Sequence, residues 1–192
     1  MKVLKFGGSS VAKPERIQRI INILKRYYTK GDQFTVVFSA FGGVTDQLIQ
    51  MAKLAEQGDD SYLQVLLAFR ERHQSVIAAL LEGATQHNVA KEMEKTHDTL
   101  ANLLHGVSLV REVSSRTMDF ILSFGERSSG FIIAHVLQQS GIQASFLDAR
   151  KIIKTNTGYG SAIVNIDTTY KNIKEYYSQN TDIQIVTGFI AS

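Results

Sequence analysis

The sequence predicts an α/β fold, with an open, mainly parallel sheet and helices on both faces. Two short, mostly apolar runs, Val3–Phe6 and Phe34–Phe38, each lead into a loop of glycine and serine and then into a helical stretch. A third such run, Ile183–Val186, lies near the end of the chain. Buried parallel strands have this composition. Repeated units of strand, loop and helix favour one sheet with right-handed crossovers.

The first helix is predicted to begin at Pro14 and to end near Lys30 and Gly31. Proline suits the first turn, because the N–H that it lacks would have no partner there, and glycine commonly ends a helix. The apolar residues that recur at helical spacing are Ile17, Ile20, Ile21, Leu24 and Tyr28. We expect this stripe to pack on the sheet.

Residues 61–104 are predicted to form a helical hairpin inserted into the α/β core. The stretch is rich in Leu, Ala, Gln, Glu and His, and we expect a break at Gly83–Asn88. The remaining predicted elements are a helix from about Thr45, helices at Ser115–Phe124 and Arg127–Gln139, a strand at Ala144–Leu147 and a helix at Asp167–Tyr177.

The chain has 192 residues, of which 44% are hydrophobic, and this is the size of a single domain. The last predicted strand delivers Thr187–Ile190 to an edge of the sheet, and no crossover helix follows it. We therefore expect residues 1–192 to be the N-terminal, substrate-binding part of a truncated domain.

The composition argues against several classes of function. The sequence has no cysteine, which rules out disulfides and thiolate metal sites and favours the cytoplasm. Its 21 basic and 18 acidic residues form no basic block, so we expect no nucleic-acid partner. No apolar run is long enough to span a bilayer and the first residues do not resemble a signal peptide, so we expect no membrane partner.

Two glycine-rich loops at predicted strand ends indicate either anion binding or tight structural turns. Glycine lets backbone N–H groups approach phosphate oxygens, and the following helix adds its positive end. Neither loop has the spacing of a P-loop or of a dinucleotide-binding loop. Lys5, in a strand that looks buried, needs an anion to offset its desolvation. The alternative for Lys5 is a lysine whose ammonium reaches solvent.

The sequence Lys5-Phe6-Gly7-Gly8-Ser9-Ser10-Val11 closely resembles the amino-terminal signature of aspartate kinases, members of the amino acid kinase family. Four further segments resemble that family in order: Val37–Ala40 with Thr45, Ser123–Glu126, Phe146–Arg150 and Val186–Ile190. The segment Leu104–Leu109 is similar to the bifunctional aspartate kinase–homoserine dehydrogenases. The family has Thr or Ser at the position of Ser9, so a hydroxyl is kept.

The resemblance implies transfer of the γ-phosphoryl group of MgATP to the β-carboxylate of L-aspartate, which gives 4-phospho-L-aspartate, the first step toward lysine, threonine and methionine. It implies ATP and Mg²⁺ as cofactors, L-aspartate as the partner, and a homo-oligomer at full length. The adenine-binding half of the family's fold lies beyond Ser192, so we expect this chain alone to be inactive.

By the same resemblance, Lys5 is the catalytic residue and reaches the phosphates. Gly7, Gly8 and Ser9 supply loop donors to the same anion, and Ser39 lies near the path of the phosphoryl group.

The resemblance also implies that Thr45 helps to hold the aspartate and that Glu126 binds its α-ammonium group. The alternative is helix capping for Ser39 and Thr45, and a helix-dipole role for Glu126 as a residue that opens a helix. The five histidines show no ligand spacing, so we read them as structural or solvated and assign no metal ligand.

Two other functions compete with aspartate kinase. One is another amino acid kinase, acting on glutamate, N-acetylglutamate or UMP, against which Ser123–Glu126 and the helical insert argue. The other is a non-catalytic remnant that binds an acidic amino acid or packs against a partner.

Overall fold

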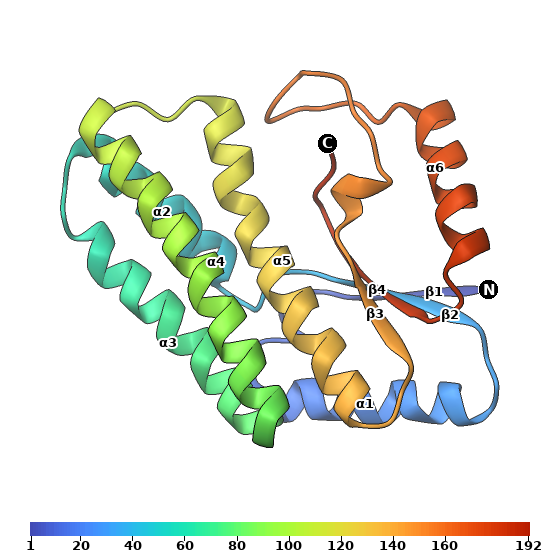
Figure 1. Cartoon of the computed structure of the whole chain (residues 1–192). Coiled ribbons are helices and arrows are strands. Elements are labelled where there is room, and N and C mark those ends of the chain that lie inside the picture. The colour runs from blue at the N-terminus through green and yellow to red at the C-terminus, as the bar shows by residue number, and fades with distance from the viewer.

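The computed structural model describes residues 1–192 and shows a parallel four-stranded sheet flanked by helices (Figure 1). The elements are β1 (Lys2–Phe6), α1 (Pro14–Thr29), β2 (Phe34–Phe38), α2 (Val44–Gln57), α3 (Tyr62–Leu80), α4 (Gly83–Val110), α5 (Ser115–Gln139), β3 (Ala144–Leu147), a 3-10 turn (Ala149–Lys151), α6 (Ile166–Gln179) and β4 (Ile183–Thr187). The strand order is β1-β2-β4-β3, and every pairing is parallel. The predicted fold class is confirmed.

The strand register divides the side chains between two faces of the sheet. The row on one face is Leu4, Val36, Ile185 and Phe146, and the next row, on the other face, is Lys5, Val37, Val186 and Leu147. The first face packs against α1 and α5 in a large apolar core that continues into the helical insert. The second face packs against α6 in a smaller cluster. Helices therefore cover both faces, as predicted.

Helix α1 begins and ends as its sequence indicates. Pro14 is its first residue, and Gly31 follows its end with a φ of +74°. The residues of its buried stripe are Ile17, Ile20, Ile21 and Leu24. In Figure 1 this helix runs beneath the sheet.

The insert differs from the predicted hairpin at its break and at its end. Gly83–Asn88 lie inside α4, which continues to Val110, and only Leu81 and Glu82 separate α3 from α4. The side-chain amide of Gln86 donates a hydrogen bond to the carbonyl of Leu81 at 2.6 Å and so satisfies a carbonyl that the end of α3 leaves free. The predicted break exists, but it lies at Leu81 and Glu82 and not at Gly83–Asn88.

Residues 115–139 form one continuous helix, α5, where two helices separated at Gly125 and Glu126 were expected. Ser114 caps the helix by accepting a hydrogen bond from the backbone N–H of Thr117 at 3.1 Å. Gly125 lies in the middle of the helix and does not break it. Glu126 therefore does not open a helix, and the helix-dipole reading of this residue was wrong.

Strand β1 is less buried than its composition predicted. It lies at the edge of the sheet, and Val3 remains 64% exposed on the face that α6 covers elsewhere. Lys5 is exposed as well. The apolar pattern could not show this, because an edge strand and a central strand have similar composition. No helix of the structure is both long and apolar enough to cross a membrane.

Candidate active site

Three loops meet at the carboxyl edge of the sheet, where ligands bind in open α/β folds. The backbone N–H of Ser39, after β2, donates a hydrogen bond to the carbonyl of Phe6, at the end of β1, at 3.2 Å. The backbone N–H of Gly188, after β4, donates to the carbonyl of Phe38 at 2.8 Å. The predicted convergence of the first two loops is confirmed, and the loop after β4 joins them.

Close packing explains part of the glycine content of these loops. A Cβ atom on Gly8 would lie 3.1 Å from the carbonyl oxygen of Ala40, and one on Gly42 would lie 2.9 Å from the Cβ of Ala12. A Cβ atom on Gly7 would meet nothing within 4 Å. Loop packing therefore requires Gly8 and Gly42, whereas it leaves Gly7 unexplained. The phosphate-binding role of Gly7 and Gly8 stays a prediction.

Lys5 and Ser9 lie where a ligand at this edge could reach them. Both are exposed, and Lys5 takes part in no ion pair. The carbonyl of Ser9 accepts a hydrogen bond from the guanidinium of Arg16 at 2.7 Å, which holds the loop against α1. The expected burial of Lys5 was wrong: its side chain reaches solvent, as in the alternative for this residue. Its catalytic role stays a prediction.

Ser39 and Thr45 stand on either side of the turn that starts α2. The helix has Gly43 at its N-cap and no side-chain cap, so the capping alternative for both residues was wrong. Ser39 is half-buried, and its carbonyl accepts a hydrogen bond from the Ser129 hydroxyl at 2.8 Å. Thr45 lies exposed in the first turn of α2. The placement of Ser39 near the phosphoryl group and the contact of Thr45 with the substrate stay predictions.

Glu126 is a buried carboxylate that takes part in no ion pair. It is 7% exposed and lies on α5 against the loop after β2. Burial raises the pKa of Glu126, and the backbone N–H of Ala40 opposes that rise. A cationic ligand would offset the desolvation of this carboxylate. No cluster of three or more His, Cys, Asp or Glu side chains is suited to a metal ion.

Gly125 allows α5 to approach the loop that follows β2. A Cβ atom at this position would lie 2.8 Å from the Cβ of Ala40 and 3.3 Å from Cδ1 of Leu48, both in the buried core. We expect Gly125→Ala to lower the free energy of unfolding by about 1–3 kcal/mol, because the helix must shift to admit the methyl group. Urea unfolding followed by circular dichroism measures this change.

Gly106 in α4 is the matched control for this substitution. A Cβ atom on Gly106 would meet nothing within 4 Å, so Gly106→Ala is expected to raise the free energy of unfolding by about 0.5–1 kcal/mol through helix propensity alone. Stabilisation by both substitutions would contradict the close approach of α5 to Ala40.

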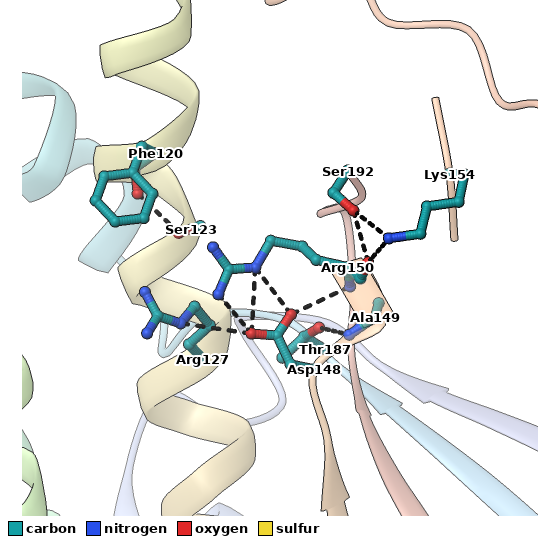
Figure 2. Close-up of polar contacts among 9 residues, drawn as sticks. All are labelled: Phe120, Ser123, Arg127, Asp148, Ala149, Arg150, Lys154, Thr187 and Ser192. Carbon is teal, nitrogen blue, oxygen red and sulfur yellow. Dashed lines mark hydrogen bonds and ion pairs between the residues drawn. The ribbon is translucent and has the colours of Figure 1, made fainter. Parts of the chain in front are cut away.

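A charged cluster that has no function predicted from the sequence lies at the carboxyl end of β3, next to the turn of α5 that carries Glu126. Arg127 on α5 and Arg150 after β3 share the carboxylate of Asp148, which is 8% exposed (Figure 2). Asp148 and Arg150 belong to a segment that resembles aspartate kinases. Their spacing of two residues is the only local signal for their pairing, and nothing local links Arg127 to them.

The chain is similar over its whole length to proteins of known family. The model of the amino acid kinase family matches residues 1–192. The chain is 29% identical to the bifunctional aspartokinase/homoserine dehydrogenase 1, chloroplastic, of Arabidopsis thaliana, over 99% of this chain and 21% of that protein. It is also 29% identical to aspartokinase 1, chloroplastic, of the same plant, over 98% of this chain and 33% of that protein.

Solved structures of an aspartokinase have the same fold. Aspartokinase III of E. coli in complex with aspartate and ADP superposes with a TM-score of 0.86 at 26% identity, over 100% of this chain and 41% of that chain. The complex with lysine and aspartate gives a TM-score of 0.87 with the same identity and coverage. The chain thus spans between a fifth and about two fifths of these relatives. On the match of the family model to all 192 residues, the chain belongs to the amino acid kinase family.

Proposed function

We propose that the full-length protein is an aspartate kinase, which transfers the γ-phosphoryl group of MgATP to the β-carboxylate of L-aspartate and forms 4-phospho-L-aspartate. The relatives support this substrate, since they are named aspartokinases and the E. coli structures hold aspartate, one of them with ADP. In this proposal residues 1–192 are the aspartate-binding part of the kinase domain, with the helical insert α3 and α4.

The observation that carries the proposal is the buried carboxylate of Glu126, which takes part in no ion pair. A desolvated carboxylate beside three converging loops favours a ligand with a positive charge, and the α-ammonium group of an amino acid supplies one. The raised pKa of Glu126 adds a pH dependence. Because only the ionised carboxylate pairs with an ammonium, amino-acid binding should weaken as the pH falls through that raised pKa.

The other site residues have roles suited to two anions that must approach each other. Lys5 and the N–H groups of Gly7, Gly8 and Ser9 bind the phosphates, and Ser39 lies near the transferring group. Thr45 holds the aspartate. The exposed ammonium of Lys5 at the end of β1 supports this assignment.

The acceptor needs no general base in this reaction. The β-carboxylate of aspartate is already ionised at neutral pH, because its ordinary pKa is about 3.9. Catalysis then depends on placing the reactants and on stabilising charge on the transferring phosphoryl group. MgATP is a substrate, and this chain contributes only part of its site. The proposal includes a homo-oligomer at full length and a cytoplasmic location, although the plant relatives are chloroplastic.

A hydroxamate assay on the full-length protein with MgATP and L-aspartate tests this function. We expect acyl phosphate with L-aspartate and little with N-acetyl-L-aspartate, which lacks the ammonium group that Glu126 would bind. Equal or better turnover of L-glutamate would overturn the substrate assignment. Absence of acyl phosphate with every acidic amino acid, together with binding of one of them, would favour a non-catalytic amino-acid-binding protein.

A further inference from the structure

Asp148 is bound by two arginines at the carboxyl end of β3 (Figure 2). Nε of Arg150 donates to both carboxylate oxygens, at 3.0 and 3.2 Å, and Nη2 of Arg150 donates to Oδ2 at 2.6 Å. Nε of Arg127 lies 3.6 Å from Oδ2. Although burial alone would raise it, the pKa of Asp148 is lowered by the two guanidinium groups, so the carboxylate stays ionised.

The backbone around Asp148 is fixed to the rest of the sheet edge. The N–H of Ala149 donates a hydrogen bond to the hydroxyl of Thr187, at the end of β4, at 2.8 Å. The ammonium of Lys154 donates to the carbonyl of Arg150 at 2.7 Å. Asp148 is therefore a fixed point against which a neighbouring element can be held.

Arg127 connects that fixed point to the turn of α5 that carries Glu126. The guanidinium of Arg127 also lies over the ring of Phe124, 4.9 Å from its centroid. One turn further on, the hydroxyl of Ser129 bonds the carbonyl of Ser39. The turn of α5 around Glu126 is thus attached to the end of β3 on one side and to the end of β2 on the other.

Arg127 has few other partners to hold it in place. Its Nη1 is buried and has no hydrogen-bond partner, and Asp148 is the only carboxylate within ion-pair distance of it. A neutral side chain at position 148 would leave two guanidinium groups close together with no anion between them. Such a cluster is unstable in a poorly solvated place, so Arg127 would move.

We propose that Asp148 is a positioning residue: through Arg127 it fixes the turn of α5 that carries Glu126, and so sets the affinity of the site for its amino-acid substrate. This inference rests on the proposed function for its kinetic consequence. Its structural consequence, the fixed position of Glu126, is independent of that function.

Asp148→Asn and Arg127→Met in the full-length protein give the kinetic test. Each is expected to raise KM for L-aspartate about tenfold and to leave KM for MgATP and kcat within about twofold, because Lys5 and the glycine loop lie on other elements. The double variant is expected to be no worse than either single variant, since both substitutions break the same link. Arg127→Met keeps the Asp148–Arg150 pair and remains informative where Asp148→Asn does not fold.

The pKa of Glu126, measured from its side-chain carboxyl resonance in this chain, gives a second test that needs no activity. Both variants are expected to lower that pKa toward the ordinary value for glutamate, because a loosened turn exposes the carboxylate. Loss of the Arg127 charge without movement would raise the pKa instead. Arg127→Met therefore separates loss of positioning from a simple change of charge.

Asp98→Asn is the matched control, since Asp98 forms a 2.8 Å ion pair with Arg70 in the helical insert. It is expected to change neither KM nor the pKa of Glu126. An unchanged KM for L-aspartate in both variants, additive effects of the two substitutions on that KM, or a raised pKa of Glu126 in Arg127→Met would each overturn the inference. Failure of the wild-type protein to phosphorylate aspartate would overturn the proposed function instead, and the measurement on Glu126 would still decide the positioning role.

Discussion

Replacement of Lys5 by alanine in the full-length protein is expected to lower kcat at least about a hundredfold, which is the scale for loss of one preorganised transition-state donor. Lys5 lies near the carboxyl end of β1, beside the loop that carries Gly7 and Gly8, and its ammonium is not held by any ion pair. It is therefore available to the negative charge of the transferring group.

Lys2 offers a matched control within the same strand. It is also exposed, but it lies at the amino end of β1 and pairs with Asp32 at 3.0 Å. Lys2→Ala is expected to leave kcat within about twofold, because a surface ion pair of this kind contributes little. The hydroxamate assay at saturating MgATP and aspartate measures both variants. A near-wild-type rate for Lys5→Ala would show that Lys5 is only a surface lysine.

Acid is expected to destabilise the chain through two buried histidines of the insert. His73 on α3 and His97 on α4 are 0% and 1% exposed, their rings lie 5.2 Å apart, and Nε2 of each is buried without a partner. Nδ1 of His73 donates to the carbonyl of Phe69 at 2.8 Å. Burial lowers the pKa of His73 to about 4 and, with the charge of His73, that of His97 to about 3.

The sign of this effect follows from which state binds protons. In the unfolded chain both histidines take up protons below about pH 6.5, whereas in the folded chain they stay neutral. The stability that they contribute is therefore fully present above that pH and is lost as the pH falls toward their folded-state pKa values. Between roughly pH 7.5 and pH 5 the loss is about 2 kcal/mol for each histidine.

Urea unfolding of this chain across that pH range measures the loss. Replacing both His73 and His97 with phenylalanine should flatten the pH dependence, because no protons then bind on unfolding at these positions. His87, which is exposed on α4, is the control, and His87→Gln should leave the dependence unchanged. Equal slopes for the wild type and the double phenylalanine variant would show that the two buried histidines are not the cause.

Local sequence predicted the elements whose signals are local. The strands Phe34–Phe38 and Ala144–Leu147 and helix α1 lie where their composition and spacing placed them. The errors arose where a long-range contact decides the outcome. Gly125 looked like a helix break, yet it is required by the proximity of Ala40, a residue far away in the sequence. β1 looked buried, because composition does not show which strand becomes the edge.

The candidate site was predicted from a resemblance more than from local physics. Residue types alone favoured a helix-dipole role for Glu126 and left Lys5 open between an anion-binding lysine and a surface lysine. The order of the segments along the chain favoured a site. The pairing of Arg127 with Asp148 could not be predicted from the sequence, because it depends on how α5 lies across the end of β3. Such side-chain pairs follow from the packing of two elements, and no characteristic spacing in the sequence marks them.

The strand order has a consequence for how the chain folds during synthesis. β1 and β2 are close in sequence and can pair early. The other edge of β2 pairs with β4, where Val36 lies opposite Ile185, and β4 is the last strand of the chain. β3 pairs only with β4. β2 and β3 therefore both lack β4 as a neighbour until the ribosome has released the last residues of this segment. Until then the edges of β2 and β3 are open to other chains. The helical insert, whose contacts are local and made with other helices, can form before β4 is available.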